Sequence, residues 1–314
     1  MIRIATIGTS VITETFLGAA RGRVAVSVVH SRDPQRGAHL ARTYAVPATT
    51  SDLDALLARD DVDAVYVASP NSVHPEQVRA CLEAGRHVLA EKPLAPTGAE
   101  AQELFALAQS RGLVLLEAMR SAFDPGTQAV RELLPLLGQV RRVSFCYHQR
   151  SSRYDRVLAG ERVNVFDPAM AGGALLDLGV YCVRPLVDLF GMPERVTMAQ
   201  VEVTTGADGA GVVLATYPGM VADLSYSKIT RSSLPSVVEG ELGTLTIDHV
   251  AAPRELVVEL LDGTRRDVQV RGEEPNLGYE IDRFAELVES GDLPVRETEG
   301  SLLAARVVDL ARGL

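Results

Sequence analysis

The chain has 314 residues, of which 46% are hydrophobic and 23% are charged, and its net charge is −10 at neutral pH. This length favours two domains over one, and the acidic balance argues against the basic surface that nucleic-acid binding needs. No apolar run reaches the ~20 residues that span a bilayer and residues 1–7 lack the pattern of a secretory signal, so we expect a cytoplasmic protein with no nucleic-acid or membrane partner.

Strands and helices alternate over the first part of the chain. Apolar and β-branched clusters predict strands over 2–7, 24–29, 62–68, 87–90 and 113–118. Helical spacing of apolar residues predicts helices over 13–20, 34–44, 53–57, 75–84 and 97–111. Strands alternating with helices of this length indicate βαβ units and a parallel sheet. We therefore expect residues 1–120 to form an α/β, doubly wound Rossmann domain.

The pattern changes after residue 120. A helix is expected over 125–137, and strands separated by turn residues are expected over 139–148, 195–205, 211–217, 220–230, 234–239, 243–249 and 254–261. Helices are expected over 275–290 and 300–312. Successive strands predict an α+β domain over 121–314 with a large, mostly antiparallel sheet, in which the C-terminal helices are free to pack back on the first domain.

The three cysteines are odd in number and far apart. Cys81, Cys146 and Cys182 contain no C-x-x-C pair. This spacing fits neither a disulfide framework nor a zinc knuckle. We expect free thiols and no metal site.

Lysine is almost absent from the chain. Of 31 basic residues, only Lys92 and Lys228 are lysine. A chain that fills positive positions with arginine retains lysine where a compact, titratable ammonium is needed, although chance retention explains one lysine equally well. Lys228 receives no role from the sequence.

A candidate phosphate-binding turn follows the first strand. Gly8 ends that strand and a helix comes next, so the helix N-terminus would receive the pyrophosphate of a dinucleotide. The G-x-G-x-x-G pattern is imperfect, because the residues that occupy it are Gly8, Thr9, Ser10, Val11 and Ile12, followed by threonine. The serine at the second glycine position adds a Cβ, but its hydroxyl could donate a hydrogen bond to phosphate.

The end of the second strand bears on the choice of cofactor. An NAD-selective domain usually carries an acid there for the ribose hydroxyl. Here Ser31 and Arg32 come first, and a hydroxyl and a guanidinium suit a 2′-phosphate. We expect NADP, with NAD as the alternative. A solvated Arg32 and a helix-capping Asp33 would be the purely structural explanation.

Two longer motifs resemble the Gfo/Idh/MocA oxidoreductase family. The first runs from Ser69-Pro70-Asn71-Ser72-Val73-His74 to Glu91-Lys92-Pro93, and the second is Gly172-Gly173-Ala174-Leu175-Leu176-Asp177-Leu178-Gly179-Val180-Tyr181. The resemblance extends to the segment near Asn276 and so covers nearly the whole chain. Tyrosine at position 181 is more similar to the glucose–fructose, xylose and dihydrodiol branch than to the inositol branch, which has histidine.

The resemblance implies a catalytic set of three residues. Lys92 would lie at the end of a parallel strand beneath the nicotinamide, and its peptide bond to proline is commonly cis in this family. Asp177 and Tyr181 are spaced four residues apart, so on an α-helix they would share one face. We expect Lys92 and Tyr181 to act as a coupled acid/base pair. Asp177 would orient them or bind a second substrate hydroxyl.

The chemistry of this pair follows from its side chains. Oxidation of a secondary alcohol requires that the hydroxyl proton leave while hydride passes from carbon to nicotinamide. Free tyrosine and lysine side chains have pKa values of ~10 and ~10.4. A neighbouring cation and an oxidised nicotinamide favour their deprotonated forms. The sequence does not say which of the two carries the proton. Each residue also has a purely structural explanation. Lys92 could lie in an ordinary turn, Asp177 could be a charge at a helix N-terminus, and Tyr181 could be a core aromatic residue.

Further cofactor contacts are expected at strand ends, where open sheets bind ligands. His74 is better explained as a structural loop residue than as an acid. His148, on the first strand of the second domain, would line the substrate pocket or face solvent. The expected contacts are Ser69, Pro70, Asn71, His74, Glu91, Lys92, Met119 and Arg120.

The resemblance implies an NAD(P)-dependent oxidoreductase that acts on a secondary alcohol of a sugar, polyol or trans-dihydrodiol. Two alternatives share the fold: a non-catalytic NAD(P)-binding regulator and an NAD-dependent glycosidase. Substrate-dependent NADPH absorbance would distinguish turnover from binding alone, and an aglycone released without net NADH would indicate the glycosidase. We also expect a homodimer or homotetramer, because an uncovered sheet face would otherwise meet water.

Overall fold

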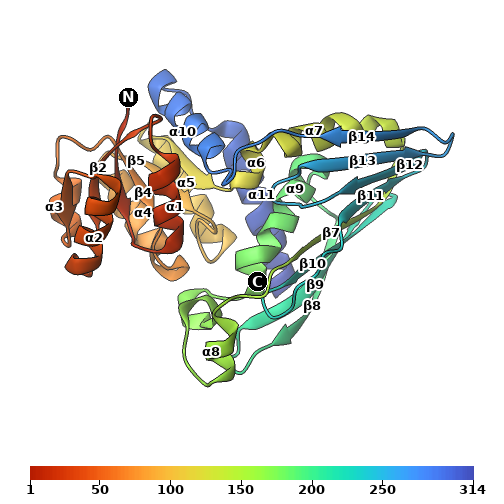
Figure 1. Ribbon diagram of the computed structural model, residues 1–314, viewed down its shortest axis with the longest axis horizontal. Helices are drawn as coiled ribbons and strands as arrows, with labels where there is room; N and C mark the ends of the chain where they lie inside the picture. The colour runs from red at the N-terminus through yellow and green to blue at the C-terminus, as the bar shows by residue number, and fades with distance from the viewer. The chain divides into compact units, whose positions relative to one another are not determined.

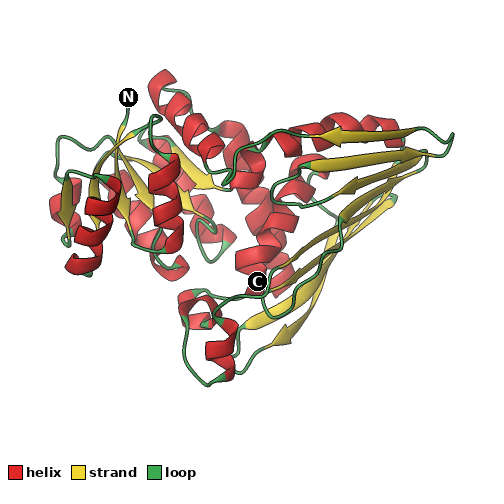
Figure 2. Cartoon of the chain, in the orientation of Figure 1, coloured by secondary structure: helices red, strands yellow, loops and turns green.

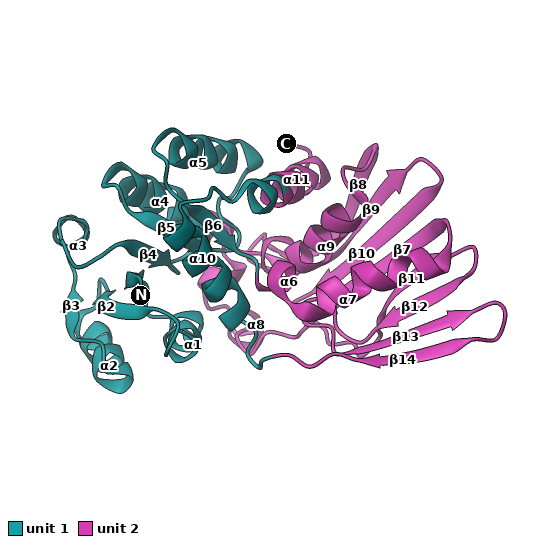
Figure 3. Ribbon diagram, turned by 90° about the horizontal axis from the view of Figure 1, so that it is seen from above, with its two compact units in different colours: residues 1–119, 273–299 teal, residues 120–272, 300–314 magenta.

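The computed structural model describes residues 1–314, and the chain divides into two compact units. Unit 1 comprises Met1–Met119 and Glu273–Glu299, and unit 2 comprises Arg120–Gly272 and Gly300–Leu314 (Figure 3). The division is not a single cut near residue 120, because the segment Glu273–Glu299 groups with the N-terminal unit.

Unit 1 is built on a six-stranded parallel sheet. Its strands are β1 (Arg3–Ile7), β2 (Ala25–His30), β3 (Ala48–Thr50), β4 (Ala64–Val67), β5 (His87–Glu91) and β6 (Leu115–Ala118). They lie in the order β3-β2-β1-β4-β5-β6, which is the order of dinucleotide-binding folds. The prediction of a doubly wound parallel sheet is confirmed. The sequence analysis missed β3, because three residues at a sheet edge give no periodic signal.

Helices cover both faces of this sheet. Figure 3 shows α4 and α5 on one face and α1 and α2 on the other. The strand order reverses between β1 and β4, so the carboxyl ends of these two strands border the crevice in which such sheets bind ligands. The helices of unit 1 are α1 (Val11–Ala19), α2 (Pro34–Tyr44), α3 (Leu53–Leu57), η1 (Asn71–Val73), α4 (His74–Glu83), α5 (Gly98–Ser110) and α10 (Gly278–Ser290).

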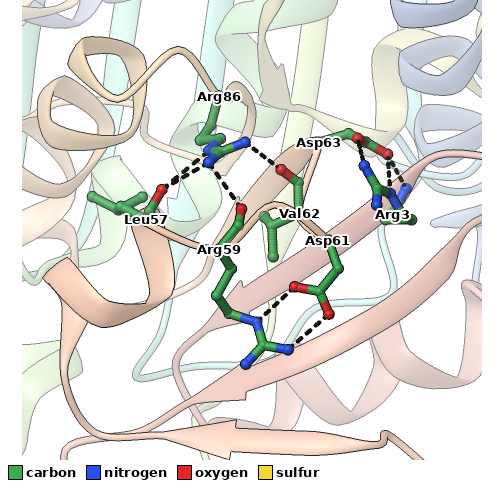
Figure 4. A network of polar contacts seen from close by, with 7 residues as sticks. All are labelled: Arg3, Leu57, Arg59, Asp61, Val62, Asp63 and Arg86. Atoms are coloured by element: carbon green, nitrogen blue, oxygen red, sulfur yellow. Dashed lines mark hydrogen bonds and ion pairs between the residues drawn. The ribbon is translucent and has the colours of Figure 1, made fainter.

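The opposite, amino-terminal edge of the sheet is held by arginines (Figure 4). Arg3 begins β1 and binds the carboxylate of Asp63, which precedes β4. Arg86 precedes β5, and its guanidinium donates hydrogen bonds to the carbonyl oxygens of Leu57, Arg59 and Val62. Loop carbonyls that would otherwise lack partners are thereby satisfied. This edge carries structural contacts, and the carboxyl edge remains for ligands.

Unit 2 is built on an eight-stranded sheet in the order β14-β13-β12-β11-β7-β10-β9-β8. All neighbours are antiparallel except β7 and β10, which confirms the predicted large, mostly antiparallel sheet. The strands are β7 (Val140–His148), β8 (Arg195–Glu202), β9 (Asp208–Tyr217), β10 (Met220–Ser227), β11 (Ser236–Gly240), β12 (Gly243–Ile247), β13 (Glu255–Leu260) and β14 (Arg265–Gln269). The sequence analysis missed β14, an exposed and mostly polar edge strand.

Helix α9 (Val180–Phe190) packs on β7 and β10 (Figures 1 and 2). The face of the sheet that α9 covers is called the inner face, and the opposite one the outer face. Buried side chains of the inner face include Val143, Phe145 and Leu224. The other helices are α6 (Arg120–Phe123), α7 (Pro125–Leu133), η2 (Leu134–Leu137), α8 (Tyr154–Leu158), η3 (Asn164–Phe166), η4 (Pro168–Met170), η5 (Leu175–Gly179) and α11 (Val295–Arg312), whose residues from Gly300 onward belong to unit 2.

One helical stretch, Pro168–Phe190, is long and apolar enough to cross a membrane by length and composition. Its mean hydropathy is 1.3, and 78% of the apolar window is buried inside the protein. It includes α9, which packs against the sheet of unit 2. Burial of this kind is typical of the core helix of a folded domain.

Candidate active site

The turn after β1 is shaped for close approach of a ligand. Gly8 has φ 117°, and a Cβ at this position would collide with the backbone carbonyl of Ala68 at the end of β4. Ser10 is the N-cap of α1, and its buried hydroxyl has no hydrogen-bond partner in the protein. Backbone amides, the helix dipole and this hydroxyl are donors of the kind that suit an anion. The turn therefore fits a dinucleotide pyrophosphate, despite the serine at the second glycine position.

A pocket of about 310 Å³ lies beside the end of β2. The carboxylate of Asp33 caps α2 by accepting hydrogen bonds from the amides of Gln35 and Arg36. Arg32 is exposed. The pocket is lined by Ser31, Pro34, Gly37, Thr49, Thr50 and Ser51. The predicted Ser31 thus lines a cavity, and Asp33 caps the adjacent helix α2 through its Oδ1 atom.

Arg36 is a residue that the sequence analysis did not identify. It lies in the first turn of α2, and its guanidinium donates a hydrogen bond to the carbonyl oxygen of Thr9, 3.3 Å away, in the phosphate turn. This contact links α2 to the turn after β1 and places positive charge near it. No local motif distinguishes this arginine from the others of the chain.

The ends of β4 and β5 are tied together by His74. Its ring nitrogens lie 2.8 Å from the carbonyl oxygen of Ser69 and 2.9 Å from that of Pro93. The side chain is fully buried, and burial lowers the pKa of the imidazole. Both ring nitrogens face carbonyl oxygens of the protein, of which a neutral imidazole donates to one, and this arrangement favours the structural role for His74.

Lys92 follows directly after β5, at the carboxyl edge of the sheet, and is half-buried. The Lys92–Pro93 peptide is cis, as the family resemblance implied. On one side of it, Glu91 accepts a 2.6 Å hydrogen bond from the phenol of Tyr66. On the other side, Glu117 of β6 accepts a 3.0 Å bond from the amide of Leu94. The backbone around the lysine is therefore fixed by buried carboxylates.

The second motif forms the beginning of a buried helix in unit 2. Leu175–Gly179 is a π-helical turn that continues into α9, where the sequence analysis assumed a plain α-helix. A Cβ at Gly179 would press on the ring of Tyr226 at 3.0 Å, so glycine permits the close packing of this turn on β10. Single π-helical turns of this kind are frequent at functional sites.

The same turn is capped by Asp208 of β9. One carboxylate oxygen accepts a 2.6 Å hydrogen bond from the amide of Leu175. Burial raises the pKa of Asp208, and the backbone hydrogen bonds from Leu175 and Ala174 oppose this shift. The charge of a carboxylate at a helix N-terminus is stabilised by the dipole. The position of the turn that carries Asp177 is therefore fixed by a contact that sequence spacing could not reveal.

Tyr181 lies in the first turn of α9 and is mostly buried. The Nε of Arg120 lies 3.3 Å from its phenol oxygen, and the guanidinium carbon lies 5.1 Å from the ring centre. Tyr147 packs edge-on against the same ring, with centroids 5.5 Å apart, and in turn contacts His249. Arg120, expected among the cofactor contacts, is thus a cationic neighbour of Tyr181.

Tyr147 and His148 show how alternation along a strand assigns side chains. Tyr147 is on the inner face of β7, with Val143 and Phe145, and contacts Tyr181. His148 is on the opposite face, where its Nε2 lies 3.1 Å from the hydroxyl of Ser225. His148 therefore lies on the face of β7 opposite to Tyr147 and Tyr181, because a one-residue step on a strand reverses the face. The alternation could have identified Tyr147.

Asp177 has a partner that the sequence analysis left without a role. The ammonium of Lys228 lies 2.6 Å from the carboxylate, and its side chain is 4% exposed whereas that of Asp177 is 38% exposed. The remaining predicted contacts, Pro70 and Asn71, follow β4, and Met119 follows β6 and is buried.

The strand order and the glycine turn after β1 define a protein with a dinucleotide-binding Rossmann domain. Residues 2–119 match the model of the oxidoreductase family with an NAD-binding Rossmann fold, GFO/IDH/MocA, and residues 127–246 match a C-terminal domain of the same family. The chain belongs to this family.

Two relatives illustrate the range of the family. The chain is 37% identical to the scyllo-inositol 2-dehydrogenase (NADP(+)) IolU of Bacillus subtilis, over 99% of this chain and 96% of the relative. It is 33% identical to the trans-1,2-dihydrobenzene-1,2-diol dehydrogenase of Mus musculus, over 91% and 87%. Their names refer to a polyol and a trans-dihydrodiol, two of the substrate classes that the sequence analysis considered.

Among solved structures, the 3-ketoreductase KijD10 of Actinomadura kijaniata, in complex with TDP-benzene and NADP, superposes with a TM-score of 0.87 at 29% identity. The match covers 99% of this chain and 96% of that chain. A levoglucosan dehydrogenase matches with a TM-score of 0.88 at 18% identity, a likeness that concerns the fold alone.

Proposed function

We propose that this protein is an NADP-dependent oxidoreductase that transfers hydride between the nicotinamide and a secondary alcohol of a sugar, polyol or trans-dihydrodiol. The observation that carries the proposal is the placement of Lys92 directly after β5, at the carboxyl edge of a sheet with dinucleotide-binding order. Ligands bind such sheets at that edge. The named dehydrogenase and reductase relatives support the reaction class.

The residues around the phosphate turn fit the cofactor. Gly8 permits the close approach of the pyrophosphate, and the hydroxyl of Ser10 supplies a donor with no partner in the protein. Ser31 and Arg32 would bind the 2′-phosphate, because a hydroxyl and a guanidinium match its charge and geometry. Asp33 caps α2 through its Oδ1 atom. A relative that uses NADP(+) and a solved relative with bound NADP support this choice over NAD.

Lys92 and Tyr181 would act as the acid/base pair. When bound, NADP supplies the hydride acceptor of the reaction. The residues of this chain must then remove the hydroxyl proton and hold the alcohol in the orientation that hydride transfer requires. Arg120 lies beside the Tyr181 phenol, with its Nε 3.3 Å from the phenol oxygen, and would hold that oxygen in position. Asp177, two residues from the end of the π-helical turn, would accept a hydrogen bond from a second substrate hydroxyl.

Substrates with adjacent hydroxyl groups suit this arrangement. One hydroxyl would be oxidised at the acid/base pair, and its neighbour would bind the carboxylate of Asp177. Inositols, cyclic sugars and trans-dihydrodiols all have such a pair of hydroxyls.

We also propose that the protein forms a homodimer or homotetramer through the outer face of the sheet of unit 2. Large apolar side chains are exposed there on three neighbouring strands. An apolar sheet face of this kind is usually covered. The side chains are Val201, Val212, Leu214 and Val221. Sedimentation showing a monomer at micromolar concentration would refute this assembly, and Leu214→Arg should disrupt it.

The function is tested by a spectrophotometric screen. scyllo-Inositol, D-xylose, D-glucose and trans-1,2-dihydrobenzene-1,2-diol would each be incubated with the protein and NADP+ or NAD+. We expect absorbance of the reduced nicotinamide with at least one alcohol, and a higher kcat/KM with NADP+. Tight NADPH binding without turnover of any alcohol would contradict the proposal and favour a regulatory protein.

A further inference from the structure

Lys228 is a buried lysine in a chain that otherwise uses arginine. It is one of two lysines among 31 basic residues, and only 3% of it is exposed. Burial of an ammonium is costly unless the charge is paired and hydrogen-bonded. The position therefore requires compensating contacts, and they identify what the lysine does.

The ammonium of Lys228 contacts a carboxylate, a carbonyl oxygen and an aromatic ring. The carboxylate of Asp177 lies 2.6 Å away, the carbonyl oxygen of Val165 accepts a 3.0 Å hydrogen bond, and the ring centre of Phe166 lies 4.9 Å away. A compact ammonium satisfies this set, whereas the planar fork of arginine is larger and has a different geometry. The contacts explain why lysine is retained here.

The backbone of Lys228 is held on both sides. Its amide donates a 2.8 Å hydrogen bond to the carbonyl oxygen of Gly209, and its own carbonyl accepts one of 2.8 Å from the amide of Ser151. The residue thus extends the pairing of β10 by one position. Because the backbone is fixed and the side chain is buried, the ammonium is a rigid charge.

Asp177 is the more exposed member of the pair. Its side chain is 38% exposed, and it lies in the π-helical turn that is capped at its start by Asp208. Capping fixes the backbone of the turn, and Lys228 fixes the end of the side chain. A carboxylate that is paired with a buried, fixed cation is already oriented before a ligand binds.

We propose that Lys228 is a positioning residue that holds the Asp177 carboxylate, ionised and in one orientation, to bind a hydroxyl group of the substrate next to the one that is oxidised. This inference rests on the proposed function, in which Asp177 binds a second hydroxyl. Lys228 acts through Asp177 and does not touch the substrate or the cofactor.

The test compares Lys228→Met, Asp177→Asn and the double variant. scyllo-Inositol is the probe, and its binding to the complex of the protein with NADPH is followed by NADPH fluorescence, because the chain contains no tryptophan. We expect each single variant to weaken polyol binding and to raise the polyol KM roughly 10–100-fold, the worth of a hydrogen bond to a charged group. The Kd of NADPH should change by less than twofold.

Non-additivity separates positioning from general destabilisation. If Lys228 acts through Asp177, the double variant should lose no more polyol affinity than the worse single variant. Losses that multiply in the double variant, or unchanged polyol affinity in Lys228→Met, would overturn the inference. If Lys228→Met fails to fold, Lys228→Gln retains a donor for Val165 and takes its place.

Arg184→Met is the matched control. Arg184 on α9 forms an ion pair with Asp188, 2.9 Å away, and its side chain, like that of Lys228, is 4% exposed. Its loss should lower the melting temperature but leave polyol binding and KM unchanged. Equal loss of polyol binding in this variant would show that the effect comes from general destabilisation and would refute the role of Lys228.

The two proposals fail in different ways. A wild-type protein that binds the polyol on the NADPH complex but oxidises no alcohol would remove the proposed function, and a Lys228-dependent affinity would still support this inference. Oxidation with unchanged polyol binding in Lys228→Met would leave the proposed function and remove the inference. Absence of both polyol binding and turnover would overturn both.

Discussion

The phosphate turn of unit 1 and the π-helical turn of unit 2 position their functional groups in different ways. At Gly8 the chain relies on backbone shape, since a glycine with positive φ permits close contact with the end of β4. At Asp177 the chain relies on buried side-chain charges, supplied by Lys228 and Asp208 from distant strands. The turn at Gly8 can be recognised in a short segment of the sequence, whereas the groups around Asp177 come from distant segments.

This difference predicts how each region responds to substitution. A site built from backbone shape should be sensitive to any added side chain. A site built from charged side chains should be sensitive to isosteric neutralisation but tolerant of conservative changes nearby. Lys92 lies at the carboxyl edge of the parallel sheet, as the phosphate turn does, but its proposed role depends on its ammonium.

The largest expected effect is that of Lys92→Ala. Loss of one member of an acid/base pair should reduce kcat by about 10²–10⁴-fold. The Kd of NADPH, measured by fluorescence titration, should stay within a few-fold of the wild-type value, because the phosphate turn is unchanged. Near-normal turnover would reject the catalytic assignment. Lys92→Arg retains the charge and shows how much of the loss is due to charge alone.

Gly8→Val tests the backbone device. The Cβ would collide with the Ala68 carbonyl, so the turn must shift and lose hydrogen bonds to the pyrophosphate. We expect NADPH affinity to fall roughly 10–100-fold, measured by the same titration. Gly18→Ala in α1, where an added Cβ has no neighbour within 4 Å, is the matched control and should bind NADPH normally. Equal affinity in both variants would contradict the proposed phosphate site.

Arg32→Ala tests the cofactor choice. Removing the guanidinium proposed to bind the 2′-phosphate should lower kcat/KM for NADP+ about tenfold or more and leave that for NAD+ nearly unchanged. Arg79→Ala removes an arginine that pairs with Glu103 on the surface of unit 1 and should change neither. A parallel loss with both cofactors would mean that Arg32 does not read the phosphate.

The smallest effect is expected at the amino-terminal edge of the sheet, away from both devices. The hydrogen bond from Arg3 lowers the pKa of Asp63. A depressed pKa stabilises the fold above the ordinary value of about 4, and this contribution is lost as the pH falls through the folded-state pKa. Asp63→Asn should therefore lower the melting temperature by about 1–2 °C at pH 7 and by less near pH 3. A difference that grows on acidification would contradict this sign.

The local devices could be predicted from the sequence, and the distant ones could not. The phosphate turn, the strand that ends at Lys92 and the motif from Gly172 to Tyr181 are each contained in a short segment. The register that brings Lys228 and Asp208 to the same helical turn depends on β9 and β10. Arg36 is one arginine among many, and its contact with Thr9 depends on how α2 packs.

The predicted helices and strands show the same limit. Helix α2 was predicted with its observed bounds, Pro34–Tyr44, because Asp33 and Pro34 mark its start. Short or polar edge strands, β3 and β14, gave no signal because their pairing is decided by neighbours. The π-helical turn was read as α-helical, since the periodicity of five residues cannot distinguish the two.

The most direct test of the account is a crystal structure of the protein with NADP+ and a polyol that it turns over. The account predicts that Lys92 Nζ and Tyr181 Oη both lie within hydrogen-bond distance, about 2.6–3.2 Å, of the hydroxyl above nicotinamide C4. A structure in which neither group reaches that hydroxyl, or in which the two side chains face different cavities, would contradict it.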